Sequence, residues 1–175
     1  MHVKDKQFEL MIPDLEIKNA VKRLAQKIYL DYRDANPLFV SVLNGSFIFT
    51  ADLLRELQLQ AEIEFIKVSS YQKTSRGELQ VHLDLMSELD GRPVIILEDI
   101  VDTGNTIKYL LQHLKDKNCQ SIEIATLLLK PDIFDYSFPV KYVGIEIENK
   151  FVIGYGLDYD GLGRNLKHLY KLKEK

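Results

Sequence analysis

Three carboxylate side chains stand close together, directly after a short run of aliphatic residues. Glu98, Asp99 and Asp102 follow the apolar run 94–97, and a small polar segment comes next, before a helical pattern begins. Ionised side chains are rarely buried without a partner. Three acids at the end of an apolar strand therefore favour binding of cations or hydroxyl groups over a role in packing.

The residues after these acids suit a phosphate group. Thr103, Gly104, Asn105 and Thr106 precede a helix that we expect to begin at about Ile107. The free N–H groups and the dipole of a helix N-terminus attract anions, and glycine lets a ligand approach the backbone. Acids beside such a site hold magnesium or accept hydrogen bonds from sugar hydroxyls, so the segment predicts a sugar-phosphate site. Taken alone, Thr-Gly-Asn-Thr is also compatible with a simple helix-capping turn.

Strands and helices alternate along the chain and must position these residues. Apolar spacing predicts helices over 14–33, 47–57 and 107–114, and strands over 38–43, 61–70, 79–83, 94–97, 122–129, 142–147 and 151–153. This order is typical of βαβ units, so we expect an α/β fold with a mainly parallel, twisted sheet flanked by helices. Ligands of such sheets bind at the carboxyl ends of strands, where the breaks 44–46 and 98–106 and Lys130 all fall.

Size and composition limit the class of protein. The 175 residues, 46% hydrophobic and 28% charged, can bury a core of their own, and we expect a single domain over 1–175. The net charge of −3 argues against a nucleic-acid partner, no apolar run reaches the length of a membrane span, and residues 1–10 lack a signal-peptide pattern. Since the single Cys119 cannot form an internal disulfide, we expect a cytoplasmic protein.

The acidic segment also resembles a known family. Residues 97–106, Leu-Glu-Asp-Ile-Val-Asp-Thr-Gly-Asn-Thr, resemble the phosphoribosyl-pyrophosphate binding motif of the type I phosphoribosyltransferases. The resemblance covers nearly the whole chain: residues 42–47 resemble the family's pyrophosphate loop and residues 69–77 its flexible lid. Residues 128–130 and 150–159 resemble the base-recognition segments of the hypoxanthine–guanine branch, and they are the more specific part of the match.

The resemblance implies a fold and an activity. The fold would be the type I phosphoribosyltransferase sheet with a small hood built from the terminal segments. The activity would be magnesium-dependent purine salvage, in which phosphoribosyl passes from 5-phosphoribosyl 1-pyrophosphate to hypoxanthine or guanine, giving IMP or GMP and pyrophosphate. The implied partners are these small molecules and further copies of the chain in a homodimer or homotetramer, with no nucleic acid and no membrane.

The resemblance also implies a role for each matching residue on the purine side. Asp102 would be the catalytic base, close to N7 of the purine. Lys130 would donate a hydrogen bond to the 6-oxo group, Phe151 would stack on the ring, and Val152 would meet the edge of the base through its backbone.

The remaining matches would bind the ribose, the phosphates and the metal. Glu98 and Asp99 would contact the ribose hydroxyls, directly or through magnesium, and Asp158 would hold a second magnesium. The other implied substrate contacts are Thr103, Gly104, Asn105 and Thr106 at the 5′-phosphate, Asn44, Gly45 and Arg164 at the pyrophosphate, and Ser70 and Tyr71 in the closing lid.

Two positions depart from the family pattern. Asn44 stands where the family often has a basic residue, so the pyrophosphate contact there loses its charge. Gly163 stands before Arg164, where the family often has a bulky residue, which leaves the geometry of that loop open. A non-proline cis peptide bond near Leu43-Asn44 is a further family feature that no residue pattern predicts.

Each assignment has a plainer alternative. Phe151 in an apolar segment would ordinarily belong to the core, Lys130 before Pro131 would be a solvated loop lysine, and Asp158 with Arg164 could form a surface ion pair. For the whole chain, one alternative is a regulatory protein that uses this fold as a nucleotide sensor. Such a protein would need a surface that binds nucleic acid, and only residues 167–175 are markedly basic. A generic nucleotide-binding α/β domain is another, and it leaves the purine-side residues unexplained.

Overall fold

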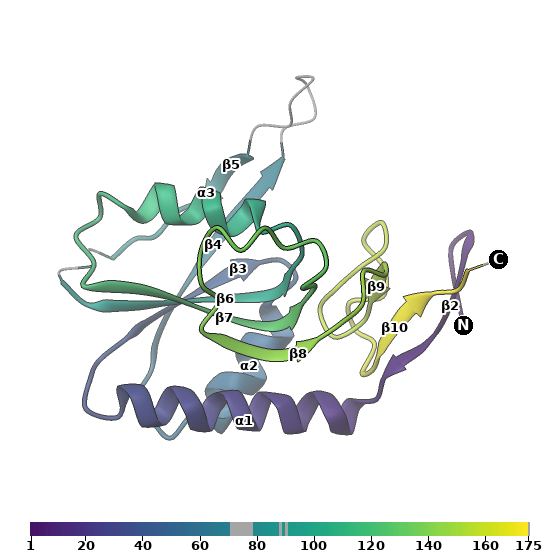
Figure 1. Ribbon diagram of the computed structural model, residues 1–175, viewed down its shortest axis with the longest axis horizontal. Helices are drawn as coiled ribbons and strands as arrows, with labels where there is room; N and C mark the ends of the chain where they lie inside the picture. The colour runs from purple at the N-terminus through teal and green to yellow at the C-terminus, as the bar shows by residue number, and fades with distance from the viewer. Residues whose placement is uncertain (71–78, 88, 90, 175) are drawn as a thin grey trace.

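The structure is a computed structural model that describes residues 1–70, 79–87, 89 and 91–174. Figure 1 shows a large sheet with helices on both faces and a smaller sheet at one end, where both termini lie. The elements are β1 (His2–Val3), β2 (Lys6–Ile12), α1 (Asp14–Tyr32), β3 (Leu38–Leu43), α2 (Phe47–Glu56), β4 (Glu62–Ser70), β5 (Leu79–Leu83), β6 (Pro93–Val101), α3 (Asn105–Leu114), β7 (Ser121–Leu129), β8 (Tyr142–Glu146), β9 (Val152–Ile153) and β10 (Leu169–Leu172).

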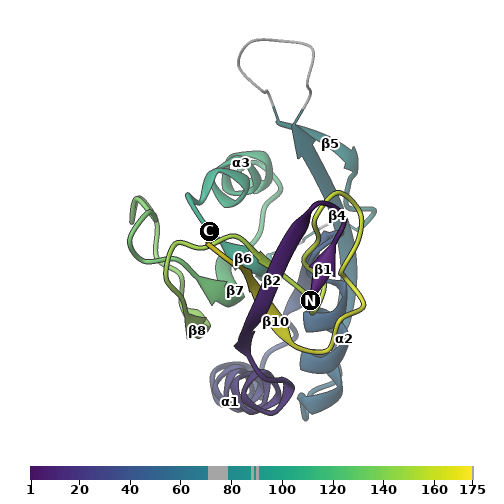
Figure 2. The same cartoon turned by 90° about the vertical axis from the view of Figure 1, so that its right-hand side faces the viewer.

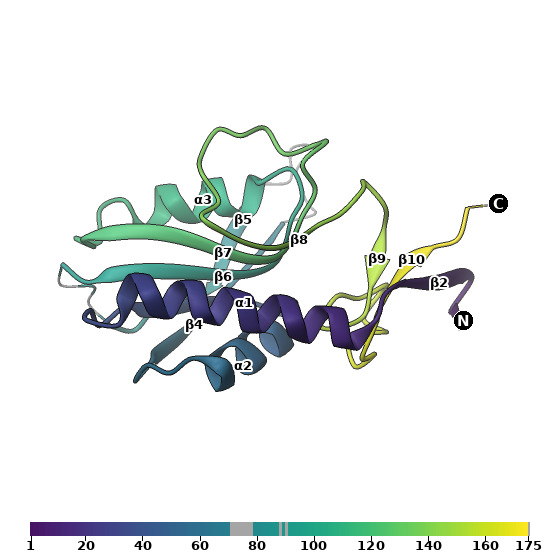
Figure 3. The same cartoon turned by 60° about the horizontal axis from the view of Figure 1, so that its bottom comes forward.

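The large sheet is mainly parallel, as the alternation of strands and helices predicts. Its strand order is β5-β4-β3-β6-β7-β8, and each neighbouring pair is parallel except β4 and β5. Helices α1 and α2 cover one face and α3 covers the other (Figure 3). The predicted fold class is confirmed. No helix in the described part of the chain is long and apolar enough to cross a membrane.

Successive residues of the central strands pack into two different cores. Phe39 and Ile95 face α1 and α2, whereas Val40 and Ile96 face α3. Side chains alternate between the two faces of a strand, and a parallel sheet covered by helices is buried on both. This is why β3 and the first half of β6 read as almost continuous apolar runs, and why Ser41 is the one polar residue of β3.

The smaller sheet joins the two ends of the described chain. Its order is β1-β2-β10-β9, with β2 and β10 side by side in Figure 2. Tyr170 of β10 pairs with Leu10 on one side and with Ile153 on the other. This sheet is the hood that the resemblance implies. The sequence does not predict β2, because only Phe8 and Ile12 of its seven residues are buried and its main partner is β10, far along the chain.

Strand β6, which carries the acids, is longer than the sequence predicts. The expected end at Leu97 is wrong, since pairing with β3 stops at Leu97 but pairing with β7 continues to Val101. Glu98 and Asp99 are therefore strand residues, and β3 turns away beside them into the 44–46 loop. Helix α3 begins at Asn105 rather than Ile107.

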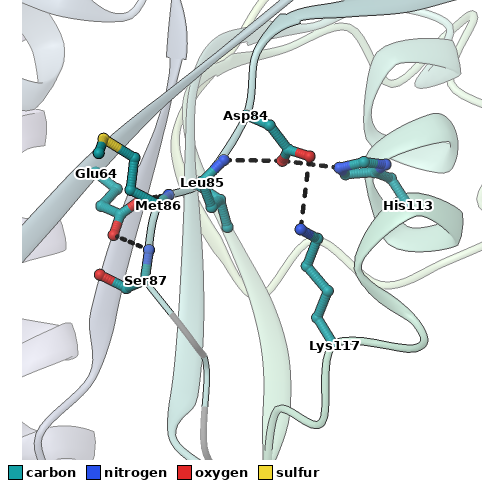
Figure 4. A network of polar contacts seen from close by, with 7 residues as sticks. All are labelled: Glu64, Asp84, Leu85, Met86, Ser87, His113 and Lys117. Carbon is teal, nitrogen blue, oxygen red and sulfur yellow. Dashed lines mark hydrogen bonds and ion pairs between the residues drawn. The ribbon is translucent and has the colours of Figure 1, made fainter.

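Two carboxylates fix the segment that follows β5 (Figure 4). Asp84 accepts hydrogen bonds from the backbone N–H of Leu85 at 2.8 Å and from Nε2 of His113 at 2.9 Å. Glu64 accepts the backbone N–H groups of Met86 at 2.7 Å and Ser87 at 2.8 Å. Because His113 belongs to α3 and Glu64 to β4, these contacts tie the segment to both elements.

Candidate active site

A cavity of 340 Å³ opens between the carboxyl ends of the parallel strands and the hood. Strands β3, β6 and β7 end beside it, and the residues after β9 close its other side. Eight residues that the resemblance implicates line this cavity: Gly45, Asp99, Asp102, Lys130, Phe151, Val152, Asp158 and Arg164. Two further lining residues, Ile100 and Leu157, were not predicted, because an aliphatic residue in a strand or loop carries no chemical signal.

Lys130 and Asp102 form an ion pair inside this cavity. Nζ of Lys130 lies 2.9 Å from Oδ2 of Asp102 and 3.4 Å from Oδ1 of Asn149. The backbone N–H of Lys130 donates to the carbonyl of Val101, which holds the start of the loop after β7 at the end of β6. Lys130 is only 6% exposed, so the alternative of a solvated loop lysine is wrong. Asp102 is about half exposed and faces the open cavity.

The carboxyl groups of Glu98 and Asp99 are both buried, and few hydrogen bonds offset the cost of removing them from water. Among the described residues, Oε2 of Glu98 has no hydrogen-bond partner, and Oδ1 of Asp99 accepts the backbone N–H of Ile100 at 2.9 Å. Burial raises the pKa of Asp99 to about 6. Burial, together with the charge of Asp99, raises the pKa of Glu98 well above its usual range. A buried carboxylate with a free oxygen requires a cation or a hydroxyl donor from a ligand.

A cation would have to complete its coordination with ligand atoms. Within the described ranges, no group of three or more acidic, histidine or cysteine side chains is arranged as a ready metal site. Glu98, Asp99 and Asp158 thus do not form a protein-only cage. Magnesium commonly takes only one or two carboxylates and completes its shell with water and substrate phosphates. The unpartnered oxygen of Glu98 and the cavity-facing Asp99 fit that pattern of binding.

A second, smaller cavity of 80 Å³ lies at the N-terminus of α3. Glu98 and the loop 103–106 line it, together with the first turn of the helix. The volume is roughly that of two or three water molecules, since one occupies about 30 Å³ in the liquid. A single phosphate group is of this size, and the helix N-terminus attracts its charge.

Glycine is needed at the entry to this helix. Gly104 has φ of +85°, and a Cβ there would lie 2.9 Å from the ring of Phe134. It is also the N-cap residue, and no side chain caps the helix. The structure therefore does not favour the alternative in which Thr-Gly-Asn-Thr serves only to cap α3.

The loop after β3 lies directly against the acids. A Cβ on Gly45 would come 1.7 Å from Oδ2 of Asp99, so only glycine fits. The peptide bond between Leu43 and Asn44 is cis, and the side chain of Asn44 is exposed. Beneath the loop, the buried hydroxyl of Ser41 lies 2.7 Å from that of Ser46 and 2.8 Å from that of Thr50.

Asp158 and Arg164 form the ion pair of the plainer alternative, but they also face the cavity. Nη2 of Arg164 lies 2.6 Å from Oδ1 of Asp158, and Nη1 donates to the carbonyl of Gly156 at 2.7 Å. Both side chains remain partly exposed, so ligand atoms can reach them. Gly163 adopts φ of +98°, a conformation that few bulky residues adopt, which accounts for the glycine before Arg164.

Phe151 lies outside the core. Its side chain is 47% exposed, so the alternative of a core residue is wrong. The ring meets Tyr159 edge to face, with centroids 5.9 Å apart, and lies 6.3 Å from Phe8. Val152 beside it is buried in β9. An exposed ring held by its aromatic neighbours can stack on a flat ligand.

Two of the implied residues lie at the margin of what the structure describes. Ser70 ends β4, and Tyr71 falls in the segment 71–78, outside the described residues. The lid therefore stays a prediction. At the other end of the chain, Lys171 lies 3.1 Å from Glu148, and Lys150 forms an ion pair with Glu174. This pairing does not favour the nucleic-acid surface that the regulatory alternative requires.

Comparison with known proteins extends these observations. The phosphoribosyl transferase domain family matches residues 13–160. A hypoxanthine-guanine phosphoribosyltransferase of Dictyostelium discoideum is 39% identical over 173 residues, which cover 95% of this chain and 96% of that protein.

Solved structures give the same result at the level of the fold. A hypoxanthine phosphoribosyltransferase of Staphylococcus aureus is 38% identical, with a TM-score of 0.88, and the match covers 97% of this chain and 92% of that one. The hypoxanthine phosphoribosyltransferase of Trypanosoma cruzi, in complex with the product IMP, is 36% identical with a TM-score of 0.88, covering 99% and 97%. The likeness therefore includes both the large sheet and the hood.

Proposed function

The chain belongs to the phosphoribosyl transferase domain family, and from this membership we propose that it is an enzyme of purine salvage. It transfers phosphoribosyl from 5-phosphoribosyl 1-pyrophosphate to hypoxanthine or guanine and releases pyrophosphate. The observation that carries the proposal is the ion pair of the buried Lys130 with Asp102, which faces a cavity with an exposed aromatic ring at Phe151. An ammonium, a carboxylate and a stacking surface together suit a 6-oxopurine.

The pair would recognise the base and move its proton. Lys130 has only donors, so it accepts a 6-oxo group as a partner and rejects a 6-amino group. As N9 of the purine bonds to the anomeric carbon, the ring nitrogen N7 becomes acidic, and Asp102 would take its proton as general base. The same ammonium holds the Asp102 carboxylate in place at 2.9 Å.

The smaller cavity and the acids would bind the sugar phosphate. The 5′-phosphate would lie on the N–H groups of the loop 103–106, with Glu98 and Asp99 at the ribose hydroxyls. Gly45, Asn44 and Arg164 would bind pyrophosphate. We propose that Glu98 and Asp99 also hold magnesium and that Asp158 holds a second ion. When bound, magnesium would screen the charge that gathers on the departing pyrophosphate.

The setting of the enzyme is part of the same proposal. The one cysteine, Cys119, is a free thiol, which is consistent with a reducing, cytoplasmic compartment. We expect the chain to act as a homodimer or homotetramer. Size-exclusion chromatography with light scattering tests this, and a monomeric mass would contradict it.

One assay tests the proposed function directly. The purified protein is mixed with magnesium and 5-phosphoribosyl 1-pyrophosphate, and pyrophosphate release is measured with hypoxanthine, guanine, xanthine and adenine. We expect release with hypoxanthine or guanine and little with adenine. A protein that releases no pyrophosphate with any of the four bases does not have this function.

Replacing Lys130 by alanine is expected to lower kcat/KM for hypoxanthine by about ten- to a hundredfold, because the 6-oxo group loses a charged donor. The KM for 5-phosphoribosyl 1-pyrophosphate should change less, since in this proposal Lys130 contacts the base rather than the ribose or the phosphates. Lys108→Ala is the matched control: Lys108 pairs with Asp135 on the surface, outside both cavities. Unchanged hypoxanthine kinetics in the Lys130 variant would remove it from base recognition.

A further inference from the structure

A buried tyrosine connects the hood side of the cavity to helix α2. Tyr155 follows β9, is 3% exposed, and donates its phenol proton to Oδ2 of Asp52 on α2 at 2.6 Å. Burial, together with the hydrogen bond to Asp52, raises the pKa of Tyr155 above its ordinary value. The phenol therefore keeps its proton at neutral pH and always donates.

The backbone around this tyrosine has an unusual conformation. Gly154, Tyr155 and Gly156 have φ of +101°, +48° and +104°, all in the left-handed region. Glycine adopts such angles freely, but a bulky aromatic residue is disfavoured there. A tyrosine at this position therefore needs a compensating role for its side chain, and the structure provides two: burial of the ring and the hydrogen bond to Asp52.

The residue after Tyr155 sets the distance between two loops of the site. A Cβ on Gly156 would come 2.0 Å from the carbonyl oxygen of Gly45, so the two backbones are in close contact. Gly156 also exchanges hydrogen bonds with Arg164: its N–H donates to the carbonyl of Arg164 at 2.9 Å, and its carbonyl accepts from Nη1 at 2.7 Å. A shift of Gly156 therefore moves Arg164 relative to Gly45.

We propose that Tyr155 and Asp52 are positioning residues, which fix the loop 154–164 against the loop 44–46 and thereby set the affinity for pyrophosphate. Neither side chain lines the two cavities of the site, so both act through Gly156 and Arg164 rather than by touching substrate. The inference rests on the proposed function, in which Gly45 and Arg164 bind pyrophosphate. It adds to that function a contact outside the cavities, the hydrogen bond between Tyr155 and Asp52, which holds the pyrophosphate loops in position.

Replacing Tyr155 by phenylalanine tests this role, because it removes only the hydroxyl. We expect the Kd of magnesium pyrophosphate, measured by calorimetry, and the KM for 5-phosphoribosyl 1-pyrophosphate to rise about tenfold, which is the scale of one lost hydrogen bond to a charged group. The value of kcat should stay within about threefold, since Asp102 and Lys130 are not displaced. Asp52→Asn keeps an acceptor for the phenol and should restore most of the affinity that Asp52→Ala loses.

The chain offers a matched control for the loss of stability. Tyr142 on β8 is 2% exposed and donates to Oδ2 of Asp31 on α1, also at 2.6 Å. Tyr142→Phe removes the same kind of hydrogen bond away from both cavities. It should lower the melting temperature about as much as Tyr155→Phe does, and leave pyrophosphate affinity unchanged.

The outcomes separate the two proposals. If Tyr155→Phe and Tyr142→Phe lower the melting temperature alike and neither changes pyrophosphate affinity, Tyr155 is merely structural and the positioning role is wrong. If the unaltered protein binds pyrophosphate but releases none in the four-base assay, the proposed function fails, while the calorimetric comparison still decides the role of Tyr155. An unaltered protein that binds no pyrophosphate overturns both.

Discussion

Replacing Asp102 by asparagine is expected to lower kcat for IMP formation by about 10²- to 10⁴-fold, the usual contribution of a general base. Asparagine keeps the shape of the side chain and an oxygen that can accept the hydrogen bond from Lys130, which lies 2.9 Å away. It cannot take a proton from the purine. The KM for hypoxanthine should therefore change by less than about threefold, since binding contacts persist while the transition-state interaction is lost. Steady-state kinetics with saturating 5-phosphoribosyl 1-pyrophosphate measures both constants.

Asp135→Asn is the control for this substitution. Asp135 also pairs with a lysine, Lys108, but both are on the surface and outside the two cavities. A double variant with Lys130→Ala adds a second test, because residues in one ion pair act as a unit and their effects on kcat/KM should not add. A normal kcat in Asp102→Asn would rule out the general-base role. An unchanged kcat with a much higher KM would make Asp102 a binding residue only.

The metal-free protein is expected to gain stability as the pH falls from 7.5 to 5. In the unfolded chain the carboxyls of Glu98 and Asp99 ionise near pH 4, whereas burial raises the pKa of Asp99 to about 6 and that of Glu98 well above its usual range. Between these values the folded state still binds protons that the unfolded state has released, so stability falls as the pH rises through this window. For Asp99 the change from 3.8 to about 6 corresponds to about 3 kcal/mol in total, of which roughly half is regained by pH 5.

Urea denaturation in the presence of a chelator, at pH 5, 6 and 7.5, measures this dependence. Glu98→Gln removes one of the two buried acids, so at pH 7.5 it should stabilise the metal-free protein by about 1–3 kcal/mol and flatten the pH profile. It should also reduce the stabilisation that magnesium and pyrophosphate give the unaltered protein. Glu146→Gln, at the exposed end of β8, is the control and should change neither property. A Glu98→Gln protein that is less stable than the unaltered chain at pH 7.5 contradicts the prediction.

Local patterns in the sequence account for much of the fold and predict a sugar-phosphate site at residues 98–106, whereas the purine side came from the resemblance. Strand β3 has the predicted bounds, 38–43, because its burial on both faces leaves an apolar run that ends at a polar break. The acids of residues 98–102 stand out for the same reason, since charge next to a buried run has no packing explanation. Lys130 and the segment 150–159 were recognised through resemblance, and the structure brings them to one cavity with Asp102.

Contacts between distant parts of the chain account for what the sequence did not predict. The extension of β6 past Leu97 depends on β7, and β2 depends on β10, so neither is visible in a local window. The burial of Lys130 follows from the approach of its backbone to Val101. Tyr155 lies between Gly154 and Gly156, and two glycines so close together indicate a backbone with positive φ angles. Its partner Asp52, on a helix of the opposite half of the chain, has no signal at all.

The hood has a consequence for how the protein is made. Strands β3 to β8 form the entire large sheet, and all of them precede β9 and β10 in the chain. In a nascent chain the sheet, with Asp102, Lys130 and the N-terminus of α3, therefore leaves the exit tunnel before the cavity residues from Phe151 onward. The hood side of the larger cavity is complete only when β10 inserts between β9 and β2, which lies near the start of the chain. Co-translational folding would thus assemble the strand ends of the larger cavity before its hood side, so that Lys130 and Asp102 are in place before Phe151.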